Sequence, residues 1–139
     1  MADTQFEKLC AKLKSITSLQ QTPIPYTDFE YAEFVIDGVK ALYVDLNKSE
    51  AYRDEFDEDI QEFVNKKLLI SEEEYILLKA HHRFYETVQA DVNNIVGYST
   101  DSLSVTNADK PYANISNEMA RIERRLIDLF FKVRLESGS

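Results

Sequence analysis

Helix-start signals constrain the fold of this 139-residue chain more than any other feature of its sequence. A Ser or Thr followed three residues later by Glu occurs at residues 4–7, 27–30 and 71–74. In such a capping box, the hydroxyl and the carboxylate accept hydrogen bonds from backbone N–H groups that the first helical turn leaves unpaired. Apolar residues recur at helical spacing after each box, so each of the three predicts a helix.

Two further helices are expected from the same periodicity, one capped by Ser49 and the last one capped by Ser116. The five helices are expected at residues 4–22, 27–46, 49–64, 71–96 and 116–135. Gly97 is a stop signal for the fourth helix. Gly38 lies inside the second helix, where glycine costs about 1 kcal/mol relative to alanine, so close packing against a neighbour is expected there. With only three glycines and three prolines, the chain does not suit an all-β fold built from tight turns.

Each expected helix carries one apolar face. The five faces consist of Phe6, Leu9, Cys10, Leu13 and Ile16; Phe29, Ala32, Val35, Ile36, Val39 and Leu42; Tyr52, Phe56, Ile60, Phe63 and Val64; Leu77, Phe84, Val88, Val92 and Ile95; and Met119, Ile122, Leu126, Leu129, Phe130 and Val133. Hydrophobic residues make up 44% of the chain, enough for one core. We therefore expect an all-α helical bundle that forms a single domain over residues 1–135. Residues 136–139 are expected to be a tail of the kind that cloning leaves.

The connection before the last helix is unusually long, at roughly twenty residues. Two interpretations remain open: the segment is a contact arm, or it wraps the bundle with Leu103, Val105 and Tyr112 packed inward. The alternation in residues 103–105 also allows a short strand. We favour an ordered loop before the last helix that wraps the bundle and has an interface role.

Charge is distributed unevenly. The net charge is −9, from 16 basic and 25 acidic residues, which disfavours nucleic-acid binding and suits a basic protein partner or a surface past which DNA slides. Residues 50–62 hold seven acidic residues and only Arg53, whereas residues 118–135 hold five basic and three acidic residues. Such opposite patches favour head-to-tail association into rings, although both are also compatible with solvated helix faces. Ile127 and Phe131 widen the apolar surface of the last helix, which indicates a central helix or a partner.

No catalytic or metal-binding constellation is recognisable. Cys10 is the single cysteine, which excludes an internal disulfide, and we interpret it as core packing. His81 and His82 are adjacent, so they project about 100° apart on a helix and are interpreted as solvated or capping residues. The acidic stretch lacks the glycine and the ligand spacing of a calcium loop. The chain is therefore expected to be non-enzymatic, without cofactor or metal.

Nothing in the sequence predicts a membrane segment. No stretch approaches the roughly 18 apolar residues of a membrane helix, and the first residues lack signal-peptide character. A reduced, cytoplasmic setting without membrane association is expected.

Residues 76–80 and 88–116, with a weaker likeness over 34–45, resemble small helical head–tail connector proteins of tailed bacteriophages, also called adaptor or neck proteins. The resemblance implies a ring of copies bound beneath the portal protein, which extends the DNA channel and offers a docking surface to the next neck protein, the stopper. It implies no sequence-specific nucleic-acid recognition. The protein would assemble in the bacterial host cytoplasm and end in the neck of the virion.

Carried to this sequence, the resemblance implies two contact surfaces. The portal would bind the last helix through Arg121, Arg124, Arg125, Phe131 and Arg134. Neighbouring subunits would meet through the long loop and the acidic third helix, at Tyr98, Asp101, Leu103, Lys110, Tyr112, Asp57 and Asp59. The alternative function is a small acidic phage-encoded inhibitor, or DNA mimic, that binds a basic host or defence protein.

Overall fold

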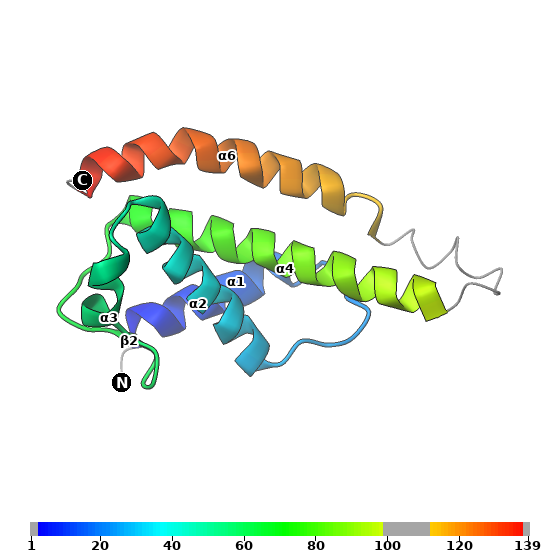
Figure 1. Ribbon diagram of the computed structural model, residues 1–139. Helices are drawn as coiled ribbons and strands as arrows, with labels where there is room; N and C mark the ends of the chain where they lie inside the picture. Colours follow the sequence, from blue (N-terminus) through cyan, green and yellow to red (C-terminus); the bar gives the residue numbers. More distant parts are fainter. Residues whose placement is uncertain (1–2, 99–111, 138–139) are drawn as a thin grey trace.

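A computed structural model describes residues 3–98 and 112–137 of the chain. Its four long helices are α1 (Gln5–Thr17), α2 (Asp28–Asp45), α4 (Ile70–Tyr98) and α6 (Ile115–Glu136), which pack side by side (Figure 1). Between α2 and α4 lie a 3-10 turn η1 (Ser49–Ala51), a short helix α3 (Tyr52–Glu55) and strands β1 (Phe56–Asp57) and β2 (Glu62–Phe63). The expected all-α helical bundle is thus confirmed. The loop expected to be ordered before the last helix, and the short strand at 103–105, lie outside the described residues.

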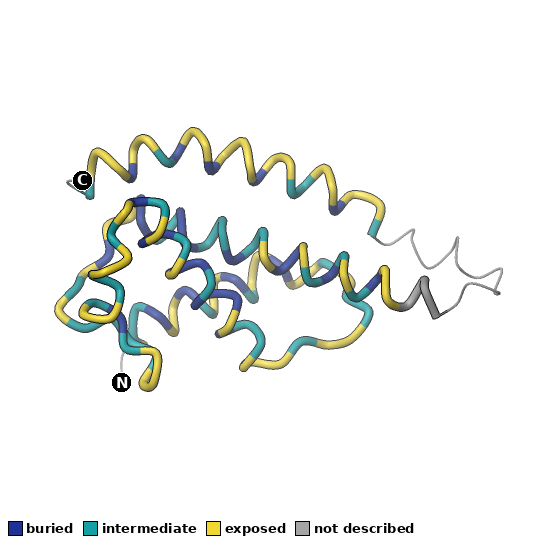
Figure 2. The backbone as a smooth tube through the Cα atoms, in the orientation of Figure 1, coloured by how far each residue is buried: buried dark blue, intermediate teal, exposed yellow. Residues whose placement is uncertain are grey.

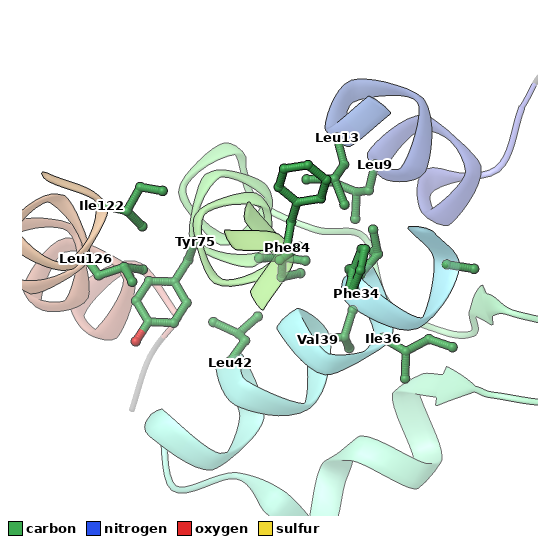
Figure 3. Packing of buried hydrophobic residues seen from close by; sticks show 14 of the residues in the cluster. Leu9, Leu13, Phe34, Ile36, Val39, Leu42, Tyr75, Phe84, Ile122 and Leu126 are labelled. Carbon is green, nitrogen blue, oxygen red and sulfur yellow. The ribbon is translucent and has the colours of Figure 1, made fainter. Parts of the chain in front are cut away.

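Helix α4 is the centre of the bundle, because it packs against α1, α2 and α6. Figure 3 shows Phe84 of α4 between Leu9 and Leu13 of α1 and Phe34 of α2. Phe84 is fully buried, and its ring meets the Phe34 ring edge-on at 6.0 Å. On the other side of α4, Ile122 and the following turns of α6 complete the core. Within the described residues, α6 packs extensively only against α4.

The starts of two helices confirm the capping signals. At α2 both halves of the box form, with the Thr27 hydroxyl accepting from the Glu30 N–H and the Glu30 carboxylate accepting from the Thr27 N–H. At α1 the Thr4 hydroxyl accepts from the Glu7 N–H at 3.1 Å. Just after α2, Asn47 has a φ of 58°, and the Lys48 N–H donates a hydrogen bond to the Tyr43 carbonyl. That geometry is the Schellman ending of a helix.

The other two long helices start earlier than expected. Helix α4 begins at Ile70, where the carboxylate of Glu72 accepts from the Leu69 N–H at 2.8 Å, so Ser71 is not its cap. Helix α6 follows Asn114, which makes no side-chain capping bond, so Ser116 is not a cap either. The start of α4 is therefore set by Glu72, whose carboxylate accepts from the backbone N–H three residues earlier, and not by Ser71.

Gly38 confirms the expected close packing. A Cβ atom at this position would lie 2.5 Å from the Ile76 carbonyl oxygen and 3.3 Å from the Ala80 nitrogen. The absence of a side chain therefore lets the α2 backbone cross directly over the α4 backbone. This crossing is the structural reason that a residue with poor helix propensity stands inside α2.

The expected third helix is wrong beyond its first turns. Instead of a helix over 49–64, the chain forms η1, α3 and a two-stranded antiparallel hairpin in which Phe56 pairs with Phe63. The two rings lie 4.9 Å apart, and the Asp57 carboxylate accepts from the Asp59 N–H at 2.9 Å to close the turn. A carboxylate that bonds to nearby backbone competes with helix formation, and seven acidic residues in one helix would repel each other.

Three predicted core residues are exposed. Ile16 and Phe29 lie in terminal turns of α1 and α2, and they are 52% and 68% exposed. Ile60, in the turn of the hairpin, is 58% exposed. Thr17 is buried instead of Ile16, and its hydroxyl donates to the Leu13 carbonyl.

Candidate partner-binding surface

Helix α6 has apolar residues on two opposite faces. Its inner face places Ile122, Leu126, Leu129 and Val133 in the core against α4. Its outer face carries Ile127, Phe131 and Leu135, which are 63%, 62% and 82% exposed. Residues four apart lie above one another on a helix, so these three form one stripe. Figure 2 shows α6 as a largely exposed helix with buried positions recurring toward α4. We call Ile127, Phe131 and Leu135 the outer stripe.

The expected arginines differ in availability. Arg121 pairs with Glu118 on α6, and Arg125 donates through Nη2 to Glu74 of α4 at 2.5 Å. Arg134 is exposed but already interacts within the chain. Arg124 is exposed and makes no ion pair within the described residues. The pair between Arg125 and Glu74 therefore helps to fix α6 on α4, and Arg124 beside the outer stripe is the guanidinium best placed to meet a partner.

A shallow groove borders the outer stripe. It is lined by Tyr75 and Lys79 of α4 and by Glu123, Leu126, Ile127, Phe130 and Phe131 of α6. The Tyr75 hydroxyl donates to Asp45 of α2 at 2.5 Å, and burial together with that bond raises the Tyr75 pKa. The hydroxyl therefore serves as a fixed donor rather than as an acid. Figure 3 shows Tyr75 directed toward Leu126 of α6.

The residues expected at subunit contacts fall into three groups. Asp57 and Asp59 lie in the hairpin, away from α6, so the structure does not bring them together with the α6 arginines (Figure 1). Tyr112 is half-buried and packs against the core. Tyr98 ends α4, and its side chain is not among those described. Asp101, Leu103 and Lys110 lie outside the described residues.

Both histidines lie at the junction of α4 and α6, which differs from the expectation of solvated residues. His82 lies 3.4 Å from Glu86 and 3.6 Å from Glu123 of α6. His81 stacks on Tyr85 with ring centroids 4.7 Å apart. Burial lowers the pKa of His81, although Glu118 acts in the opposite direction. At neutral pH His81 is therefore a neutral packing residue.

The sequence did not predict a polar cluster that joins the start of α4 to the end of α6. The buried Glu72 carboxylate accepts from Lys66 at 3.1 Å and from the Ser137 hydroxyl at 3.1 Å. Ser71 donates to Glu136 at 2.9 Å. The folded part of the chain thus extends to Ser137, beyond the expected boundary at residue 135. No local pattern predicts the bonds of Ser71 and Glu72 to α6 and Ser137, because those partners lie 65 residues apart.

Burial raises the pKa of the Cys10 thiol to about 11, so the thiol is a weak nucleophile at neutral pH. No group of three or more His, Cys, Asp or Glu residues is arranged to hold a metal ion in the part of the chain that the structure describes. In that same part, every helix is too short or too polar to cross a bilayer.

Comparisons of the chain with protein-family models, with curated proteins and with solved structures gave no match.

Proposed function

We propose that this protein is a non-enzymatic virion structural protein, a head–tail connector that binds beneath a phage portal as a ring and extends the DNA channel. The observation that carries the proposal is the outer stripe of α6. Exposing a row of apolar side chains to water, on the side of a helix opposite the core, costs free energy. Such surfaces commonly mark binding sites. The resemblance of residues 76–80 and 88–116 to connector proteins supplies the identity of the partner.

The portal would bind the outer face of α6. Phe131 is the natural anchor, because a large aromatic residue near the centre of an apolar patch contributes most when a pocket buries it. Arg124 beside it would meet an acidic group of the portal. Arg121, Arg125 and Arg134, which already interact within the chain, would flank the contact and orient it.

The remaining surface suits the other tasks of a connector. With a net charge of −9, a ring of copies would line its channel with negative potential, so that phosphates are repelled and DNA slides without binding. The acidic hairpin and the loop residues would serve neighbouring subunits, and the exposed end of the ring would receive the next neck protein. Assembly would take place in the host cytoplasm, and the protein would end in the virion neck.

The test is co-assembly with a purified portal protein encoded beside this chain. Light scattering and native mass spectrometry should show many copies bound to each portal ring. Phe131→Ala should weaken binding at least about tenfold, the loss expected for an aromatic anchor. Phe29→Ala is the matched control, since Phe29 is similarly exposed at a distant place. No complex, or equal binding by both variants, would contradict the proposal.

A second function remains as a proposal because the hairpin region offers free acids. Asp54, Asp59 and Glu62 make no ion pair within the described residues. A small phage-encoded inhibitor that mimics DNA would use such carboxylates against a basic host or defence protein. That function predicts a monomer whose binding to a basic target weakens steeply with added salt.

A further inference from the structure

The hairpin ends in a small acidic projection. Ile60 at its tip is 58% exposed and stands between Asp59 and Gln61. Asp57 holds the turn by accepting from the Asp59 and Ile60 N–H groups, so the tip has a defined shape. Glu58 is paired with Lys40 at 3.1 Å, whereas Asp59, next to Ile60, has no ion-pair partner among the residues that the structure describes. We call residues 58–61 the hairpin tip.

Helix α1 borders a hollow of the opposite charge. Leu9 and Leu68, both buried, form its apolar floor. Its rim carries Lys8, Lys12 and Lys67 together with Gln5 and one acid, Glu73. Lys8 and Lys67 make no ion pair within the described residues, and Lys12 lies 3.7 Å from Glu73. In a chain of net charge −9, three lysines around an apolar floor are a local exception. We call this surface the lysine hollow.

The hairpin tip and the lysine hollow lie on opposite sides of α1. Ile60 and Gln61 face the side of α1 that carries Glu7 and Cys10. Lys8, on the rim of the hollow, projects from the opposite side, because residues two apart on a helix, such as Lys8 and Cys10, are about 200° apart. A molecule therefore cannot place its own hairpin tip in its own hollow, whereas the tip of a second copy has free access.

We propose that the hairpin tip of one copy docks into the lysine hollow of the next copy. Ile60 would cover the apolar floor at Leu9 and Leu68, and Asp59 would lie among the rim lysines. The occupant is a second copy because the tip matches the hollow twice, with an apolar centre on an apolar floor and an acid among lysines. A tip on one side and a hollow on the other make a head-to-tail contact, which generates a ring when the rotation closes.

This contact would be the subunit contact of the proposed connector ring. It rests on the proposed function only for the claim that the ring closes on a portal. The contact itself is testable on the chain alone. Ile60→Lys blocks the tip, and the double variant Lys8→Glu with Lys67→Glu blocks the hollow. All three positions are exposed, so both variants should fold, and circular dichroism checks that they do. Each blocked variant should self-associate at least about tenfold more weakly than the unchanged chain in sedimentation velocity at low salt.

Mixing the two blocked variants gives the decisive result. The Ile60→Lys variant keeps an intact hollow, and the double lysine variant keeps an intact tip, so one copy of each can bind the other. The resulting dimer has no intact tip or hollow left to bind a third copy. The mixture should therefore stop at a dimer, whereas the unchanged chain forms larger species. Asp128→Lys and Lys132→Glu, both exposed on α6, carry the same kinds of charge change and should not alter assembly.

Cysteine cross-linking tests the same contact both on the portal and in the free chain. With Cys10 replaced by Ser, the pair Ile60→Cys and Lys67→Cys should give a ladder of disulfide-linked oligomers, with portal or without it. Ile60→Cys with Asp128→Cys should give none. An absent ladder together with a filled portal ring would overturn the contact and leave the connector proposal intact. A ladder without portal binding would support the contact and refute the connector.

Discussion

Gly38→Ala tests whether the backbone crossing of α2 and α4 organises the core. In an open helix this change stabilises by about 1 kcal/mol, because alanine has the better helix propensity. Here the new Cβ would lie 2.5 Å from the Ile76 carbonyl oxygen, and that distance must lengthen to at least 3.4 Å for ordinary contact. The oxygen belongs to backbone that α4 holds in place, so the two helices must move apart. A gap of that size weakens dispersion across the whole contact.

The magnitude follows from these opposing effects. Overpacking a core costs about 1–3 kcal/mol, and since backbone must move here the upper end applies. After subtraction of the propensity gain, we expect a loss of about 2 kcal/mol in the free energy of unfolding. In a chain of this size the melting temperature should fall by roughly 8 °C.

Urea unfolding followed by circular dichroism measures the change. Ala120→Gly on the exposed side of α6 is the control, and it reports the propensity difference alone, with an expected loss of about 1 kcal/mol. A Gly38→Ala variant as stable as the unchanged chain, or more stable, would refute the argument, because it would mean that α2 and α4 accept a methyl group at their crossing.

Three further changes test the core, its polar cluster and its pH response. Phe56→Ala should destabilise by about 3–5 kcal/mol in urea unfolding, whereas Phe131→Ala should change stability by less than about 0.5 kcal/mol, since only Phe56 is buried. Glu72→Gln should cost about 1–3 kcal/mol by the same assay, because Lys66 loses its partner. Burial lowers the pKa of His81 below 6.5, so the unfolded chain takes up the proton first and stability falls as the pH drops below that value. His81→Gln should reduce the loss of stability between about pH 7.5 and about pH 5.

Much of the fold could be predicted because its signals are local. The capping residues Thr4 and Thr27 lie next to the backbone that they satisfy, and the apolar faces of α1, α2 and α6 repeat at the helical period. The poor propensity of Gly38 also indicated a close contact from the sequence alone, although the sequence could not name Ile76 as the neighbour. Signals of this kind require no knowledge of the rest of the chain.

The hairpin could not be predicted by the same reasoning. Phe56, Ile60 and Phe63 are spaced like one face of a helix, and strands of two residues are too short to show an alternating pattern. What decides the structure is the pairing of Phe56 with Phe63 across the turn. Asn65, with a φ of 54°, is a local hint that a helix does not continue there, since asparagine tolerates the left-handed conformation better than most residues.

The candidate site was predictable in part for a related reason. A helix that is apolar beyond one face is visible in sequence, and the exposure of Ile127 and Phe131 agrees with that pattern. Which arginines are available was not visible, because the partner of Arg125 is Glu74 on another helix. The Glu72 cluster was equally hidden, since burial of a carboxylate depends on contacts distant in sequence.

The contacts at the two ends of α6 bear on how well its outer face can bind. At the start of the helix, Gln89 of α4 donates to the Ser116 hydroxyl at 3.1 Å. At its end, Glu136 and Ser137 bond to the first turn of α4. The buried inner face holds the turns between them. Because both ends and the middle are fixed, the outer stripe is presented on a helix that is already ordered. A partner that docked there would lose less free energy to ordering than it would on a loose helix.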